Sequence, residues 1–135
     1  RAEFVTILVK VLALEPQDGQ IFADTAGHWA RDALATAEYY GIVKGYDENT
    51  FGPDDFVTRE QMAAIVINAT DLERVNEETS FKDSHLVSEW AREAVATAVK
   101  HGIINGFPDN TLRPLSNATR AEAVTVIVKV LNLLA

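Results

Sequence analysis

The sequence contains no cysteine, and basic side chains are scarce relative to acidic ones. The lack of cysteine excludes a disulfide scaffold and any thiol chemistry. Twelve Lys and Arg residues stand against 20 Asp and Glu residues, which gives a formal net charge of -8. This balance disfavours non-specific binding to nucleic acid or to anionic lipid. Any anionic ligand would therefore have to be held by local groups.

Long hydrophobic runs are missing as well. The most apolar stretches are interrupted by Thr and Lys and fall short of the roughly 20 residues that span a bilayer. No secretory signal peptide is present either. The chain begins in the middle of a motif, at Arg1 without a capping Thr before it. We therefore expect a piece of a longer protein, and the missing targeting segment does not indicate where that protein goes.

Signatures of catalysis and metal binding are also absent. There is no Gly-x-Ser-x-Gly motif and no phosphate loop. Asp54 and Asp55 are a weak basis for a glycosidase, which needs one carboxylate with a raised pKa in a cleft. The loop from Asp47 fails as an EF-hand, because its last ligand position holds Thr58 in place of Glu. Three histidines without metal-ligand spacing are expected at the surface: His28, His85 and His101. We expect no enzyme, no cofactor and no metal site.

What the sequence does contain is an internal repeat. Residues 21–72 and 80–134 read as two full repeats, and residues 1–14 read as the last helix of a truncated one, all within one domain of residues 1–135. Polar joints at 15–20 and 73–79 separate them. The second repeat has two extra residues within 84–89. Pairs that lie 61 residues apart are Trp29 and Trp90, Gly41 and Gly102, Gly45 and Gly106, Pro53 and Pro114, and Arg59 and Arg120.

Each repeat ends in an apolar run that begins at Arg1, Arg59 or Arg120. The many Val and Ile residues make a buried strand an alternative to a helix. Polar residues, however, recur 2, 5, 9 and 12 positions after the Arg, which is helical spacing. We therefore predict three central helices that are buried on most sides and pack on one another.

Two of these runs also start with the pattern of a capping box, in Thr58 with Gln61 and in Thr119 with Glu122. The run at the N-terminus lacks the first helix that its own repeat would supply. We therefore expect an exposed apolar strip over Phe4 to Leu14, through which another copy of the chain could bind.

An Ala-rich amphipathic helix is predicted earlier in each full repeat, over Trp29–Tyr40 and Trp90–His101. Ser88, and less well Gly27, is placed to cap its start. At its end a glycine followed by Ile suits a C-cap with positive φ. These C-terminal pairs are Gly41 with Ile42 and Gly102 with Ile103, and the loops that follow hold Asn49 and Asn110, which tolerate the left-handed conformation.

Taken in order, Phe-x-Asp, Trp-Ala, Gly-Ile-x-x-Gly-aromatic, Asn-Thr-Phe/Leu-x-Pro and Thr-Arg-x-Glu/Gln resemble the S-layer homology (SLH) repeat of bacterial cell-surface proteins. The resemblance covers nearly the whole chain and implies an all-α, pseudo-threefold, three-pronged bundle of tandem helix-loop-helix repeats. It also implies grooves that bind secondary cell-wall polysaccharide, often through a pyruvylated sugar. Such binding would anchor a parent protein outside the cell, at the wall or S-layer.

The resemblance and the chemistry together suggest carbohydrate-binding residues. A guanidinium in the first turn of a helix, beside its free N–H groups, suits a carboxylate. Arg59 and Arg120 are therefore the leading candidates, with solvated ion pairs as the alternative, and Arg1 is the matching residue of the truncated repeat.

Three further pairs of residues have two interpretations each. The tryptophans either stack on a sugar or fill the core. The aspartates accept from sugar hydroxyls or cap the turn before the helix, or both. The glycines serve backbone conformation or let a ligand approach backbone amides. These pairs are Trp29 and Trp90, Asp24 and Asp83, and Gly45 and Gly106.

Some positions depart from the family pattern. Gln61 replaces the Glu of Thr-Arg-Ala-Glu, and Asn49 and Asn110 stand where Gly is usual. The truncated repeat lacks its own Asp and Trp, so a groove that needs them would be incomplete. The alternative function is a protein–protein or self-assembly module of a surface layer.

Overall fold

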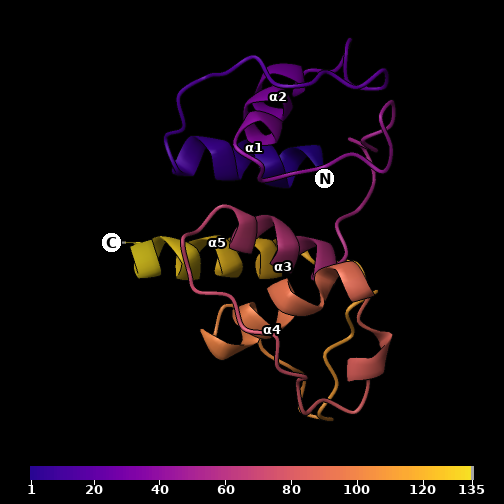
Figure 1. Cartoon of the computed structure of the whole chain (residues 1–135), viewed down its shortest axis with the longest axis vertical. Helices are drawn as coiled ribbons and strands as arrows, with labels where there is room; N and C mark the ends of the chain where they lie inside the picture. The colour runs from indigo at the N-terminus through magenta and orange to yellow at the C-terminus, as the bar shows by residue number, and fades with distance from the viewer. Residues whose placement is uncertain (135) are drawn as a thin grey trace. The chain divides into compact units, whose positions relative to one another are not determined.

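The computed structural model describes residues 1–134 and is helical (Figure 1). Within that part of the chain the one β-type pairing is an isolated bridge between Thr58 and Asn117. The predicted all-α class is confirmed. The elements are α1 (Ala2–Val11), α2 (Arg31–Tyr39), α3 (Arg59–Asn68), the 3-10 helices η1 (Ser84–Leu86) and η2 (Glu89–Ala91), α4 (Arg92–Lys100) and α5 (Arg120–Leu134).

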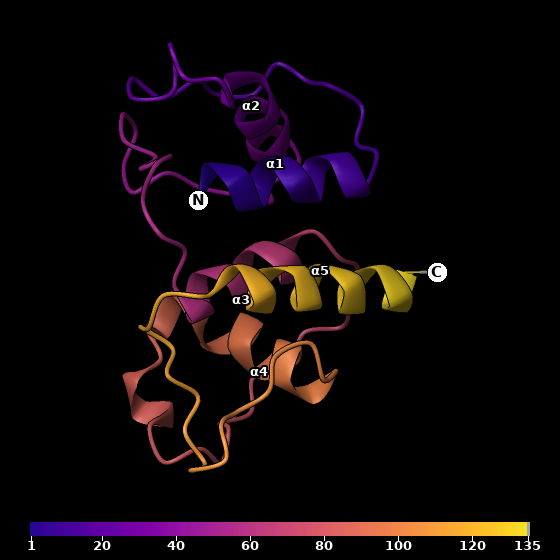
Figure 2. The same cartoon turned by 180° about the vertical axis from the view of Figure 1, so that it is seen from behind.

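The chain divides along its sequence into two compact units, with the boundary between Phe56 and Val57. In the first unit α2 packs on α1, and in the second α3 packs on α4 and α5 (Figures 1 and 2). Each unit therefore pairs the last helix of one sequence repeat with the first helix of the next. The repeat boundaries and the three-pronged arrangement stay predictions.

The first unit has no exposed apolar strip over the whole of Phe4 to Leu14. Phe4, Val5 and Leu8 are buried, although Ile7 and Val11 remain exposed. The Ala-rich face of α2, with Leu34 and Ala37 buried, packs on α1. The expectation was wrong because the partner of α1 comes from the following repeat.

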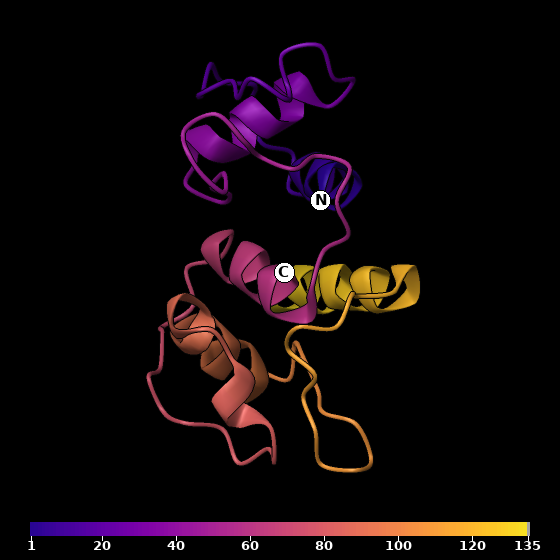
Figure 3. The same ribbon diagram turned by 90° about the vertical axis from the view of Figure 1, so that its right-hand side faces the viewer.

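In the second unit α3 and α5 lie side by side (Figures 2 and 3), but α5 is much less buried than predicted. Val5 of α1 and Ala63 of α3 are fully buried, whereas the equivalent Val124 of α5 is 59% exposed. Among the described helices, α1 and α3 each pack extensively on an Ala-rich helix, whereas α5 packs less extensively, on α3. Deep burial of all three central helices is therefore wrong for α5.

The predicted N-terminal caps of α3 and α5 and the predicted C-terminal glycine caps of α2 and α4 are confirmed. Both capping boxes form, at Thr58 with Gln61 and at Thr119 with Glu122. Gly41 and Gly102 have φ of +74° and +69°. In each case the glycine and the next Ile donate back to the last turn in the pattern of a Schellman motif, with bonds Gly41–Glu38, Ile42–Ala37, Gly102–Val99 and Ile103–Ala98.

The starts of the Ala-rich helices differ from the prediction. They begin two residues later than expected, at Arg31 and Arg92. Ser88 does not cap, because its N–H and its hydroxyl both donate to the buried Glu60 carboxylate, at 2.8 and 2.6 Å. Gly27 does not cap either, since the ring Nδ1 of His28 accepts from the amide of Ala30.

Candidate functional site

In the second unit, Arg59 and Asp83 hold the loop that follows the Ala-rich helix. Arg59 Nε donates to the carbonyl of Leu112, and Nη2 donates to that of Asn105, each at 2.8 Å. The Asp83 carboxylate accepts from the amides of Leu112 (2.8 Å) and Arg113 (2.9 Å). We call this Arg–Asp arrangement the loop clamp. Arg59 therefore bonds to the carbonyl of Leu112, and Asp83 bonds to the amide of the same residue.

The first unit repeats the loop clamp with equivalent atoms. Arg1 Nε and Nη2 donate to the carbonyls of Phe51 and Lys44, both at 3.0 Å. The Asp24 carboxylate accepts from the amides of Phe51 and Gly52. Neither aspartate caps the turn before its helix, so that interpretation was wrong. The arginines and aspartates have a structural role that the sequence interpretations missed.

The aspartates of the clamps are stabilised in their ionised form. Desolvation works against ionisation of Asp83, but hydrogen bonds from the Leu112 and Arg113 amides outweigh it and lower its pKa. The same balance, with the Gly52 and Phe51 amides as donors, lowers the pKa of Asp24. Both carboxylates are therefore charged at neutral pH.

Aromatic rings lie close to the guanidinium group of each loop clamp. The guanidinium of Arg59 lies 4.7 Å from the Phe107 ring centroid, and that of Arg113 lies 3.8 Å from the same ring. Arg1 lies 4.5 Å from the Tyr46 ring and 4.4 Å from the Phe51 ring. Desolvation is the main cause that lowers the pKa of Arg59, and the nearby charge of Arg113 adds to it. In both units the guanidinium of the loop clamp thus lies against aromatic rings.

Arg59 already holds a carboxylate. Its Nη1 forms an ion pair with Oε2 of Glu122, whose Oε1 accepts from the amide of Thr119 in the capping box. The Nη1 group of Arg59 is therefore bonded to a carboxylate of the chain itself. The sequence predicts Glu122 only as a capping residue, since nothing in its spacing indicates a contact 63 positions away.

The glycines of the site serve close packing rather than unusual dihedral angles. A Cβ at Gly45 would overlap the ring of Phe22, and one at Gly106 would overlap the ring of Phe81. Neither glycine has a positive φ. The predicted conformational reason was therefore wrong. In the loops, Asn110 has a left-handed backbone (φ +62°), but Asn49 does not. Gly52 and Arg113, which occupy equivalent positions in the two repeats, are both left-handed.

The tryptophans lie on the surface. Trp29 is 66% exposed and Trp90 is 63% exposed, so the core interpretation was wrong. A hollow of about 270 Å³ lies beside Trp29, lined also by Gly27, His28, Arg31 and others. The side chain of His28 is mostly buried and bonds to Asp54 (2.9 Å), so its expected surface position was wrong. Arg120, at the start of α5, is exposed.

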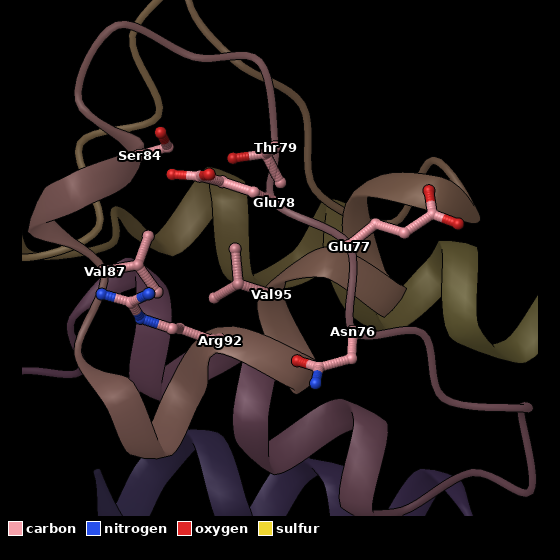
Figure 4. Close-up of a pocket in the computed structure, with 8 residues that line it drawn as sticks. All are labelled: Asn76, Glu77, Glu78, Thr79, Ser84, Val87, Arg92 and Val95. Atoms are coloured by element: carbon pink, nitrogen blue, oxygen red, sulfur yellow. The ribbon is translucent and has the colours of Figure 1, made fainter.

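A second hollow, which the sequence did not suggest, lies in the second unit between the joint 73–79, η1 and α4 (Figure 4). Its volume is about 110 Å³, below the range of about 300–1,000 Å³ usual for ligand pockets. Glu78, Thr79, Ser84 and Arg92 surround the apolar Val95 there. We assign it no role.

No helix within residues 1–134 combines the length and the apolar character needed to cross a bilayer. In the same part of the chain, no three His, Asp or Glu side chains are grouped as metal ligands would be.

The S-layer homology domain family matches the chain at residues 21–63 and 80–124, which is more than half of its length. The chain belongs to this family, and the resemblance drawn from the motifs is confirmed.

The relatives that match nearly the full chain are much longer proteins, and this chain matches only a part of each. An amylopullulanase of Thermoanaerobacterium thermosulfurigenes is 39% identical over 139 residues, which cover 98% of this chain and 7% of the relative. A surface-layer 125 kDa protein of Lysinibacillus sphaericus is 32% identical (98% and 12%). A cellulosome-anchoring protein of Acetivibrio thermocellus is 30% identical (94% and 30%). The chain thus spans less than a third of each relative.

Proposed function

We propose that the chain is a non-catalytic module that anchors a bacterial surface protein by binding secondary cell-wall polysaccharide. The family supports this proposal, as do relatives named as surface-layer and anchoring proteins. The relatives named as enzymes share only a small part of their length with this chain. Most of the length of those enzymes therefore lies outside the part that they share with this chain.

The observation that carries the proposal is the exposure of Trp29 and Trp90. The two rings occupy equivalent positions in the repeats and are each about two-thirds exposed. A large exposed aromatic ring contributes little to the core, and its flat apolar face suits the apolar face of a sugar ring. The same placement in both units is therefore better explained by ligand binding than by packing.

We further propose that the polymer is anionic, with a carboxylate such as that of a pyruvylated sugar. Arg59 supports this finer statement, because its Nη1 pairs with the Glu122 carboxylate. The Nε and Nη2 edge of the same guanidinium is bonded to loop carbonyls. A ligand carboxylate would thus contact Nη1, because the edge that could form a two-point contact is already bonded to the loop. Arg1 and Arg120 stay candidate ligand residues.

Binding to purified wall fractions, with and without ketal pyruvate, tests the proposal. The variant with both Trp29→Ala and Trp90→Ala should bind about tenfold more weakly, or ~1.4 kcal/mol. Tyr39→Ala is the matched control, because Tyr39 is 58% exposed but has Lys100 at the equivalent position. Unchanged wall binding by the folded double variant would contradict the proposal.

Self-association is a second candidate function, favoured by one observation. Val124, Val128, Leu133 and Leu134 of α5 are all exposed, and exposed apolar residues in one helix favour contact with another chain. This helix replaces Phe4 to Leu14 as the candidate surface. A concentration-dependent dimer that Val124→Ser with Val128→Ser abolishes would support it, and a monomer at high concentration would exclude it.

A further inference from the structure

We propose that Glu122 determines which anionic ligands Arg59 accepts, by acting as a tethered carboxylate that a ligand must displace. The inference rests on the proposed function, because it concerns the same guanidinium. It assigns to Glu122 a role in specificity beyond that of a capping residue.

The geometry of Arg59 leaves one route for a ligand carboxylate. Nε and Nη2 donate to the carbonyls of Leu112 and Asn105. The side chain of Arg59 is 7% exposed, whereas that of Glu122, bonded to Nη1, is 26% exposed. Glu122 is thus the more accessible partner, and a ligand that reaches Nη1 takes its place.

Tethering makes Glu122 a selective competitor. A group held by the fold competes with an effective concentration that is of the order of mM or higher. A small free carboxylate offers the same charge and nothing more, so it does not displace Glu122. A carboxylate carried on a sugar ring brings additional contacts, for example with an exposed aromatic ring, and these can outweigh the tethered group. Glu122 therefore filters simple acids from carboxylated sugars.

The chain itself provides the substitution that separates this role from capping. In the equivalent capping box of α3, Gln61 replaces Glu and forms both bonds with Thr58. Glu122→Gln can form the same two bonds with Thr119. With its carbonyl oxygen facing the Thr119 amide, its NH2 group takes the position of Oε2 and cannot accept from Arg59 Nη1. The substitution keeps the cap and releases the guanidinium.

The test measures binding of sodium acetate and of a pyruvate-ketal monosaccharide to the whole chain, read from the NMR signal of Arg59 Nε–H. The unmodified protein should not bind acetate at millimolar concentration, whereas Glu122→Gln should. The monosaccharide should bind Glu122→Gln about tenfold more tightly than the unmodified protein. Glu93→Gln is the matched control, because it removes the same charge from an exposed pair with Arg74 and should change neither result.

Acetate separates this inference from the proposed function. If neither protein binds the monosaccharide or wall polymer, the proposed function fails, and acetate binding by Glu122→Gln still supports the role of Glu122. Glu122→Asp, whose side chain is shorter by one methylene, should also bind acetate. It provides a second test in case Glu122→Gln does not fold. Absence of acetate binding in both folded variants overturns the inference.

Discussion

At the scale of single residues, charged groups of the repeat hold the loops in place. Arg59 and Asp83 bond to backbone atoms of the same residue, Leu112, although they lie 24 positions apart. A buried guanidinium and an ionised carboxylate form stronger hydrogen bonds than neutral groups do. Loop conformation therefore depends on charge, and this dependence can be measured.

Asp83→Asn should destabilise the second unit by about 1–2 kcal/mol, because one amide oxygen replaces two acceptors that face two N–H groups. Because the pKa of Asp83 is lowered in the folded protein, its contribution is complete above the unfolded pKa of about 3.9 and is lost as pH falls through the folded value. Urea denaturation between pH 2 and pH 7 should therefore show a weaker acid dependence for Asp83→Asn. Asp71→Asn, at an exposed position, is the control, and an acid dependence equal to that of the unmodified protein would contradict the assignment.

Gly106→Ala should destabilise the protein, because its Cβ would overlap the ring of Phe81. We expect a loss on the order of 1–3 kcal/mol, typical of an overpacked site. Gly27→Ala is the matched control, since nothing lies within 4 Å of its Cβ and its φ is not positive. Thermal melts should show a lower Tm for Gly106→Ala and a change of at most a few degrees for Gly27→Ala. Equal Tm values would show that the Phe81 ring moves freely.

The residues of the site could be selected from the sequence, but their contacts could not. Repeat equivalence identified Arg59, Asp83 and Gly106 as important. Their partners, Leu112, Glu122 and Phe81, lie between 25 and 63 positions away along the chain. Contacts at such separations depend on how helices pack, which local propensity and spacing do not determine.

At the scale of helices, pairing across the sequence repeats decides which faces are buried. Helix α1 packs on α2 and α3 packs on α4, so each unit is built from parts of two repeats. The sequence predicted the type of the five described α-helices and the C-terminal caps of α2 and α4, because periodicity and Gly-Ile pairs are local signals. It did not predict that η2 precedes α4, since Ser88 bonds to the distant Glu60.

Equivalent valines should respond differently to truncation. Val5→Ala should cost about 1.5–3 kcal/mol of folding free energy, because Val5 is fully buried in α1. Val124→Ala removes the same atoms from a side chain that is mostly exposed in α5, so the expected cost is below about 0.5 kcal/mol. Guanidinium chloride denaturation of the two variants tests this difference. A cost at Val124 that equals the cost at Val5 would mean that another surface covers α5 in solution.

At the scale of the whole molecule, the net charge of -8 repels the anionic ligand that we propose. Cationic groups occur at particular positions, for example Arg59 and Arg113, which both lie close to the Phe107 ring. Long-range repulsion between two anions is screened by salt, whereas contacts with a partly buried group are screened much less. The two effects therefore act on different rate constants.

The association rate with pyruvylated wall polymer should rise as ionic strength increases from about 0.01 M to about 0.15 M, because the Debye length falls from about 30 Å to about 8 Å. The dissociation rate should change little, since it depends on the local contact with Arg59, which is only 6% exposed. Surface plasmon resonance on immobilised polymer measures both rates. Polymer freed of pyruvate is the control, and its association should depend less on salt because it carries less charge. An association rate that falls with added salt would instead mean that local cations dominate the long-range field, and that the acidic surface faces away from the bound polymer.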